Sequence, residues 1–268
     1  MDVTMLGTMG WMPSDRRETT CFACRSGDDT LIFDAGTGLR RLLQPEHAHL
    51  LAASGAVHLF LTHYHLDHVC GLAYLPGVLP GRTLVIHAPE EAVSGVDPLA
   101  AVSGLLRKPY NPVDWPHLKG VSLEPLHAGP NEVAGHTVRV RAQQHSDISV
   151  AYRVDDAFVL ATDTRPDPAT AAFAEGAAVL FHEAWYNDAD PRTRLAPPPL
   201  LPGYASHSEV SAVAELARSA GVRRLVPMHL NPLHDEAYYA ALEQAARAVF
   251  PRTDVLPDGT VVDTAQDG

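Results

Sequence analysis

The stretch "LTHYHLDHVCGL", residues 61–72, constrains this chain more than any other part of its sequence. It places three imidazoles and one carboxylate within six consecutive positions, at His63, His65, Asp67 and His68. The run just before them, residues 57–62, is mostly apolar and is typical of a buried strand. Crowding so many polar groups behind such a strand costs desolvation free energy unless a partner offsets it, and a metal ion is such a partner. The stretch therefore predicts a metal site rather than a chance cluster of polar residues.

Other polar side chains follow the same rule, since each lies at the end of a predicted strand or at the start of a predicted helix. They are His145, Asp163, His207 and His229. Strand ends followed by tight turns can aim several side chains at one point. Imidazole and carboxylate ligands together suit zinc, and also manganese or iron. The candidates are too many for one tetrahedral ion, and their number indicates two.

Short apolar runs rich in β-branched and aromatic residues predict the strands, with helical patterns between and after them. The predicted strands are residues 30–33, 57–62, 84–87, 137–141, 149–154, 158–162, 179–182 and 225–228. In the clearest helix, Ser206 and Glu209 form a capping-box pattern and Gly221 marks the end. Its apolar stripe is Val210, Val213, Ala214 and Ala217. Another helix is expected over residues 236–249. This order predicts sheets covered by helices.

The composition limits the class of protein further. The chain has 268 residues, 46% of them hydrophobic, which favours a single domain over residues 1–268. A net charge of -12 repels polyanions and argues against a DNA-packaging or ribosomal-RNA-binding protein. No apolar run approaches the ~18 residues that span a bilayer, so we expect a soluble, cytoplasmic protein. Cys21, Cys24 and Cys70 are expected to be reduced, mostly buried thiols.

The H-x-H-x-D-H stretch resembles the hallmark of the metallo-β-lactamase superfamily. Motifs along nearly the whole chain are similar to its ribonuclease Z branch and the related phosphodiesterases, and they occur in the family's order. They are "LGTMGWMP", "LIFDAGTGLRRL", "TDT", "FHEAW", "SHSEVSAVAELARSAGVRRLVPMHLNP" and "ARAVFPRTDVLPDG". The resemblance implies an α/β fold of the αββα type, with two packed β-sheets, helices on the outer faces and the metals at the sheet edge.

The same resemblance divides the ligands between two divalent ions, zinc or manganese. It implies one ion on His63, His65 and His145, and the other on Asp67, His68 and His229. Asp163 would bridge them together with a water or hydroxide that acts as the nucleophile. The two ions bring four positive charges and Asp67, Asp163 and the hydroxide remove three, so a core of about +1 would favour an anionic substrate.

Proton transfer to the leaving group is also implied by the resemblance. In ribonuclease Z a histidine just before a helix contacts the phosphate, and a glutamate of an H-E-A-T motif assists it. The counterparts here are "HSE" and "HEAW", so His207 would be the general acid and Glu183 its orienting partner. Asp67 is expected to be catalytic as well as a metal ligand. The alternative for His207 is a simple polar cap residue.

Two departures from ribonuclease Z bear on the substrate. Its P-x-K-x-R-N loop, which reads the tRNA 3′ end, corresponds here to "PSDRRE". Arg17 fits the arginine, but Asp15 replaces the lysine and Glu18 the asparagine. Its long tRNA-gripping arm has no room here, because only 17 residues, 146–162, separate His145 from Asp163. Folded tRNA is therefore not expected as the main substrate.

These observations leave several hypotheses open. The first is a phosphodiesterase acting on RNA, single-stranded DNA or a cyclic nucleotide, and the second is a carboxylic ester, thioester or lactone hydrolase. A third is a non-hydrolytic relative that serves as a binding or assembly partner. Relatives are often homodimers, and no membrane contact is expected. Four basic residues could form a short anion-binding track or simply be solvated surface charges: Arg16, Arg17, Arg107 and Lys108. Four aromatic residues could stack on a base or simply pack within their loops: Tyr110, Trp115, Trp185 and Tyr204.

Overall fold

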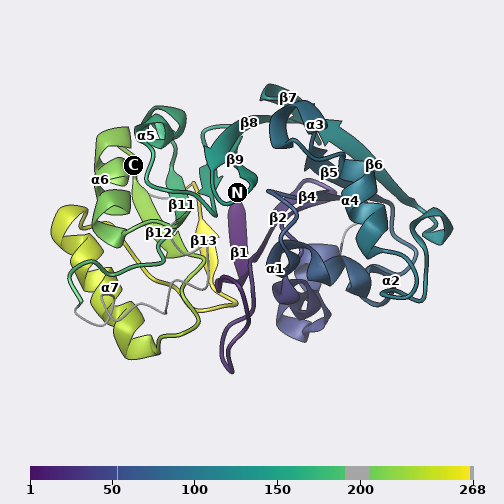
Figure 1. Cartoon of the computed structure of the whole chain (residues 1–268), viewed down its shortest axis with the longest axis horizontal. Helices are drawn as coiled ribbons and strands as arrows, with labels where there is room; N and C mark the ends of the chain where they lie inside the picture. Colours follow the sequence, from purple (N-terminus) through teal and green to yellow (C-terminus); the bar gives the residue numbers. More distant parts are fainter. Residues whose placement is uncertain (53, 191–205, 266–268) are drawn as a thin grey trace.

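Two β-sheets pack face to face, and helices cover the outer face of each (Figure 1). The computed structural model describes residues 1–52, 54–190 and 206–265. Helices of the N-terminal half lie on one side of the molecule and helices of the C-terminal half on the other. This is the αββα arrangement that the sequence predicted.

The first sheet contains seven strands within the described residues. In spatial order they are β13 (Val261–Asp263), β1 (Asp2–Gly7), β2 (Cys21–Ser26), β3 (Asp29–Phe33), β4 (Val57–Phe60), β5 (Leu84–Pro89) and β6 (Val121–Leu126). The last four are parallel, so crossovers join them. These carry η1 (Thr37–Leu43), η2 (Pro45–Leu51), α1 (Leu66–Val69), η3 (Cys70–Tyr74), α2 (Leu75–Val78), α3 (Glu91–Ser94), α4 (Pro98–Leu105) and η4 (Trp115–His117).

The second sheet contains six strands within the described residues. In spatial order they are β12 (Arg224–Met228), β11 (Val179–Glu183), β10 (Phe158–Ala161), β9 (Ile148–Val154), β8 (His136–Gln144) and β7 (Gly129–Val133). Helices α5 (Pro168–Ala174), α6 (Val210–Ala220) and α7 (Glu236–Val249) accompany them. Strands β10, β11 and β12 are parallel, and β8 runs with β10 because both are antiparallel to β9. The carboxyl ends of four strands therefore meet at one edge.

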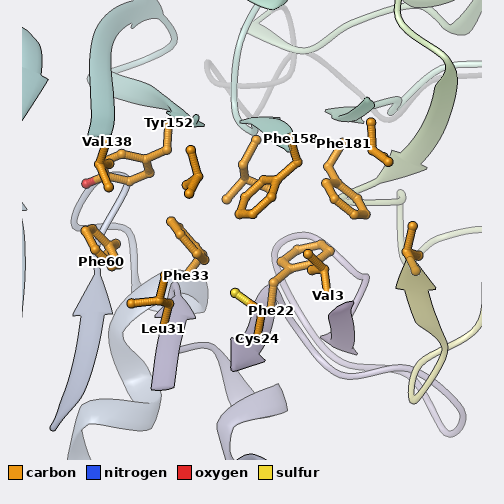
Figure 2. Packing of buried hydrophobic residues seen from close by; sticks show 14 of the residues in the cluster. Val3, Phe22, Cys24, Leu31, Phe33, Phe60, Val138, Tyr152, Phe158 and Phe181 are labelled. Atoms are coloured by element: carbon orange, nitrogen blue, oxygen red, sulfur yellow. The ribbon is translucent and has the colours of Figure 1, made fainter. Parts of the chain in front are cut away.

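Aromatic side chains fill the space between the sheets (Figure 2). Phe22 from β2 lies 5.4 Å from Phe181 of β11, measured between ring centroids. Phe33 from β3 lies 5.4 Å from Phe158 of β10 with the rings at 86°. Such aromatic pairs add to the burial of apolar area, which dominates the stability of the core. This packing holds the two sheets together beside the edge where the candidate metal ligands lie.

Both faces of strand β3 are buried. In β3, Leu31 and Phe33 point into the core between the sheets, while Ile32 points toward the helices. Alternation along a strand sends successive side chains to opposite faces. A strand covered on both faces reads as a continuous apolar run, which is why the sequence predicted it.

The predicted strands are present, and their ends differ by a few residues from those predicted. Strand β4 stops at Phe60 rather than at residue 62, because the backbone N–H of Thr62 leaves the sheet to donate to Asp34 Oδ1 at 2.8 Å. Strands β1, β2, β6, β7 and β13 were not predicted from the sequence. Strand β7 reads "GPNEV", whose residues are typical of turns, and β2 contains the two thiols Cys21 and Cys24. Both thiols are buried and unpaired, as predicted.

The capping box predicted for the helix after residue 206 is wrong. Helix α6 begins at Val210 with Glu209 as its N-cap, and the Glu209 side chain does not cap it. In the first turn, the backbone N–H of Ser211 donates to Asp188 Oδ1 at 3.2 Å. Tertiary contacts hold the preceding segment instead: Ser208 Oγ donates to the carbonyl of Thr164, just after the neighbouring strand β10. Ser206 is consequently outside the helix. The buried stripe is confirmed, and Gly221 ends the helix in the left-handed region with φ 63°.

Among the described residues, no helix is long and apolar enough to cross a membrane.

Candidate metal centre

The ends of four strands bring the candidate ligands to one place. The chain after β4 supplies the H-x-H-x-D-H residues, β8 is followed by His145, β10 by Asp163 and β12 by His229. The residues form two groups. Within each group, every residue offers one potential ligand atom, and these atoms all lie within 4.8 Å of one another. The groups are His63, His65, His145 and Asp163, and Asp67, His68 and His229. All seven residues that the sequence singled out as ligands are brought together.

Asp163 lies between the two groups. Its Oδ2 is 3.0 Å from His68 Nε2 and 3.1 Å from His229 Nε2. Its other oxygen, Oδ1, is 3.3 Å from His145 Nε2 and 4.0 Å from His63 Nε2. Each carboxylate oxygen thus faces a different pair of imidazoles, which is the arrangement of a bridging ligand.

Asp67 completes the group on the side of His68. Its Oδ2 is 3.3 Å from His68 Nε2 and 3.4 Å from His229 Nε2, and those two nitrogens are 3.3 Å apart. The backbone N–H of Trp11 also donates to Oδ2 at 2.7 Å. Trp11 has φ 60°, a conformation that a bulky residue adopts only where its surroundings enforce it. The N-terminal loop thereby fixes the direction of this carboxylate.

The protonation of His63 supports a metal at this place. Thr62 Oγ donates to Asp34 Oδ2 at 2.9 Å, so it accepts from His63 Nδ1 at 3.1 Å. The lone pair of His63 is therefore on Nε2, which is buried and has no hydrogen-bond partner among the described residues. Burial also lowers the pKa of His63 well below its ordinary value, so the ring is neutral. A neutral imidazole with a buried, unpaired lone pair is the form that binds a cation.

The charge around His68 gives the same indication. Burial alone would lower its pKa, but the carboxylates of Asp67, Asp163 and Asp34 raise it well above its ordinary value. Three buried or nearly buried carboxylates thus surround one point and require positive charge there. Divalent zinc or manganese supplies that charge and accepts these ligand types. The residues present therefore fit such ions.

Partners outside the cluster orient the candidate ligands. His68 Nδ1 donates to Asp34 Oδ2 at 2.7 Å, and His145 Nδ1 donates to the carbonyl of Ser206 at 3.3 Å. Hydrogen bonds of this kind fix the tautomer and the ring direction of a metal-binding histidine. Asp34 was not singled out from the sequence, although it lies inside the quoted motif "LIFDAGTG" just after β3. His65 is held differently, since its Nε2 lies 2.9 Å from the exposed carboxylate of Asp147.

His207 and Glu183 form a pair beside the cluster, as predicted. Glu183 is fully buried at the end of β11, and its Oε2 accepts a hydrogen bond from His207 Nδ1 at 2.9 Å. The backbone N–H groups of Thr164 and Ser208 also donate to this carboxylate. The other ring nitrogen of His207 does not take part in this hydrogen bond. A ring nitrogen of His207 lies within 4.8 Å of potential ligand atoms of Asp163 and His229, so His207 borders the cluster.

The carboxylate of Glu183 also sets the charge of His207. Burial alone would lower the pKa of His207, but the adjacent negative charge of Glu183 more than offsets this effect and raises the pKa above its ordinary value. A raised pKa increases the fraction of the imidazole that carries a second proton near neutral pH. The pair can therefore donate a proton at the edge of the cluster.

Arg17 does not contribute to an anion track, nor is it solvated surface. It is 3% exposed, and its Nε and Nη2 each donate to a carboxylate oxygen of Glu236 at 2.8 Å. Its Nη1 donates to Thr8 Oγ at 2.9 Å and to the carbonyl of Leu256 at 2.7 Å. Arg17 is thus committed to joining the N-terminal loop to α7. The other basic candidates, Arg16, Arg107 and Lys108, are exposed.

Two of the three aromatic candidates for base stacking that the structure describes pack within the protein. Trp185 is buried, and Trp115 packs against the core under the first sheet. Tyr110 is 75% exposed. Tyr204 lies outside the described residues. Loop packing, the alternative to stacking, therefore describes two of the four.

Known proteins resemble this chain over most of its length. A model of the beta-lactamase superfamily domain matches residues 29–230. A ribonuclease Z from Mycobacterium sp. strain KMS is 30% identical over 273 residues, covering 96% of this chain and 94% of that protein. Among solved structures, the metallo-β-lactamase-fold protein YhfI from Bacillus subtilis gives a TM-score of 0.74 at 20% identity and covers 98% of both chains. The short form of human tRNase Z gives 0.69 at 16% identity, covering 98% of this chain and 99% of that one. The chain belongs to the metallo-β-lactamase superfamily of metal-dependent hydrolases, in its ribonuclease Z-like branch.

Proposed function

We propose that this protein is a phosphodiesterase that uses two divalent metal ions, zinc or manganese, to cleave a small or single-stranded phosphodiester. The observation that carries the proposal is the pair of His207 and Glu183 beside the ligand cluster. A protonated histidine next to the metals is needed when the leaving group is a poor one, as it is in RNA, DNA and cyclic nucleotides. The relatives named ribonuclease Z support an RNA substrate among these.

The seven clustered residues would hold the two ions. His63, His65 and His145 would bind one, and Asp67, His68 and His229 the other, with Asp163 between them. When bound, two such ions activate a water and stabilise the negative charge that builds up on a phosphoryl group. Asp67, with a side chain 12% exposed, would also accept a hydrogen bond from the attacking water and so orient it.

His207 would protonate the leaving oxygen. Its Nδ1–H bond to Glu183 leaves Nε2 as the atom that carries the transferable proton toward the cluster. Glu183 would hold the ring in place and favour its charged form. As the bond between phosphorus and the leaving oxygen breaks, the proton moves from Nε2 to that oxygen, and solvent protonates His207 again.

Folded tRNA is a poorer candidate because of the N-terminal loop. Arg17 is bound to Glu236 and cannot reach a phosphate without breaking that pair, and Asp15 adds negative charge to the same loop. The lack of a long arm is a weaker argument, because the mycobacterial ribonuclease Z is matched over 94% of its own length and so is similarly short. We therefore favour short single-stranded or cyclic substrates because of the loop.

A substrate panel tests the proposal. It consists of thymidine 5′-(p-nitrophenyl phosphate), a short RNA, single-stranded DNA, cyclic nucleotides and precursor tRNA, with p-nitrophenyl acetate and a lactone as carboxylic counterparts. We expect turnover of the phosphodiesters by protein loaded with zinc or manganese, and none after chelation. His207→Ala should slow cleavage of natural phosphodiesters by about 10²-fold or more while retaining metal. Turnover of only the ester or lactone would support the second hypothesis, and no turnover of any substrate would support a non-hydrolytic role.

A further inference from the structure

The ring of His207 is held by a second contact besides Glu183. The indole of Trp185 lies parallel to the imidazole, with ring centroids 4.3 Å apart and an angle of 12° between the planes. Trp185 is 3% exposed and follows β11 two residues after Glu183. Both of these contacts come from one short segment, "HEAW", where the ribonuclease Z motif has threonine in place of tryptophan. The rings of His145 and His229 lie on other sides of His207, at 5.0 and 5.5 Å between centroids.

The two contacts constrain different motions of the ring. The bond from Nδ1 to Glu183 sets the position of one edge, but the ring can still turn about that bond, since the last side-chain torsion of histidine has a broad energy minimum. A flat indole stacked on one face opposes that rotation, because turning the imidazole would drive its edge into the indole. Together the contacts fix the direction in which Nε2 points.

Trp185 is itself held through both its backbone and its side chain. The backbone N–H of Trp185 donates to the carbonyl of Ser208 at 3.0 Å, which ties it to the residue after His207. On another side lies Gly10, where an added Cβ would come within 2.6 Å of the indole and 2.4 Å of the His229 ring. Only glycine at position 10 leaves room for the indole between the N-terminal loop and the imidazoles.

We propose that Trp185 is a positioning residue for proton donation: it holds the plane of the His207 imidazole so that Nε2 faces the leaving oxygen. This inference rests on the proposed function, in which His207 is the general acid. Trp185 also lies 5.5 Å from the His229 ring, measured between centroids, so metal content has to be followed beside activity. A positioning role predicts that the effect of Trp185 on turnover is largest where the leaving group needs a proton. The stacked cation and indole also attract one another, which favours the parallel arrangement.

Two substrates with the same nucleotide separate this role from a structural one. Thymidine 5′-(p-nitrophenyl phosphate) has a good leaving group that departs without a proton, whereas thymidine 5′-(phenyl phosphate) has a poor one. For each variant the measured quantity is the ratio of kcat on the phenyl ester to kcat on the p-nitrophenyl ester. This ratio does not depend on the fraction of enzyme that is folded. Elemental analysis follows metal content in parallel.

We expect Trp185→Leu to lower the ratio by about tenfold, a part of the 10²-fold or greater effect of the general acid itself. The loss should fall on kcat rather than on KM, and metal content should not change. Trp185→Phe keeps a flat ring against His207 and should restore most of the ratio. An unchanged ratio in Trp185→Leu, or an equal loss in Trp185→Leu and Trp185→Phe, would overturn the proposal.

His207→Ala distinguishes failure of this inference from failure of the proposed function. If His207→Ala lowers the ratio and Trp185→Leu does not, His207 is the general acid and Trp185 does not position it. If His207→Ala leaves the ratio unchanged, the general acid is not His207 and both proposals fail.

Discussion

Asp34 provides a demanding test of the metal centre, because it touches the candidate ligands without being one. It is fully buried, and it accepts hydrogen bonds from Thr62 N at 2.8 Å and from His68 Nδ1 at 2.7 Å. Asp34→Asn keeps the shape of the side chain but replaces one acceptor oxygen with an NH₂ group. If the remaining oxygen still accepts from the backbone N–H of Thr62, the new NH₂ group faces His68 Nδ1. An NH₂ group can only donate, so Nδ1 would have to present a lone pair instead of a proton.

The change of partner would move the proton of His68 to the wrong nitrogen. When Nδ1 accepts from the new amide group, the remaining ring proton must lie on Nε2, which is 3.0 Å from Asp163. A protonated Nε2 cannot bind a metal. Loss of an orienting partner of this kind typically lowers metal affinity 10- to 100-fold, or about 1.4 to 2.7 kcal/mol.

The assay is competition for zinc against a chromophoric chelator, with the metal content of the recovered protein as a second readout. Asp258→Asn is a matched control. Its carboxylate is also nearly buried and accepts from Thr8 N at 3.1 Å and Glu18 N at 2.6 Å, but it lies outside the ligand cluster. We expect Asp258→Asn to lose stability and keep zinc affinity. A folded Asp34→Asn protein with affinity within about twofold of the wild type would refute this role of Asp34 toward His68.

Three further predictions concern single residues. Asp163→Ala should abolish binding of at least one of the two ions, which elemental analysis would detect, and full metal content would disprove a bridging role. Arg17→Lys should lower the free energy of unfolding by about 2 kcal/mol, because an ammonium cannot reproduce the bidentate pair with Glu236, yet kcat/KM on short RNA should stay within about threefold. Lost activity in a stable Arg17→Lys protein would instead show that Arg17 binds substrate. Burial, with a smaller contribution from His58, lowers the pKa of His87 to about 4, so protons bind preferentially to the unfolded chain as the pH falls below about 6.5. The free energy of unfolding should therefore decline as the pH falls from about 6.5 to 4. In urea titrations at several pH values, His87→Phe should make this decline less steep. An equally steep decline in both proteins would contradict the role given to His87.

The sequence could predict that the candidate ligands lie together, because the signal for this is local. His63, His65, Asp67 and His68 stand within six positions, and the remaining candidates follow strands whose apolar pattern is easily recognised. Strands that run parallel or share a direction end at the same edge, so order along the chain was enough to expect that these side chains meet.

What the sequence could not predict depends on contacts between distant residues. Arg17 looked available for a phosphate, but its partner Glu236 is 219 positions away. The capping pattern of Ser206 and Glu209 is a valid local signal, and it failed because contacts with the neighbouring strand ends hold that segment away from the helix. Asp34 resembles any aspartate after a strand until its hydrogen bond to His68 is seen.

The central claim is that two ions on this cluster drive phosphodiester cleavage. The most direct test is a titration of metal-free protein with zinc or manganese, following bound metal and turnover of a short RNA in the same samples. We expect two equivalents bound per chain and full turnover only after the second. Saturation at one equivalent, or full turnover with only one ion bound, would contradict the claim.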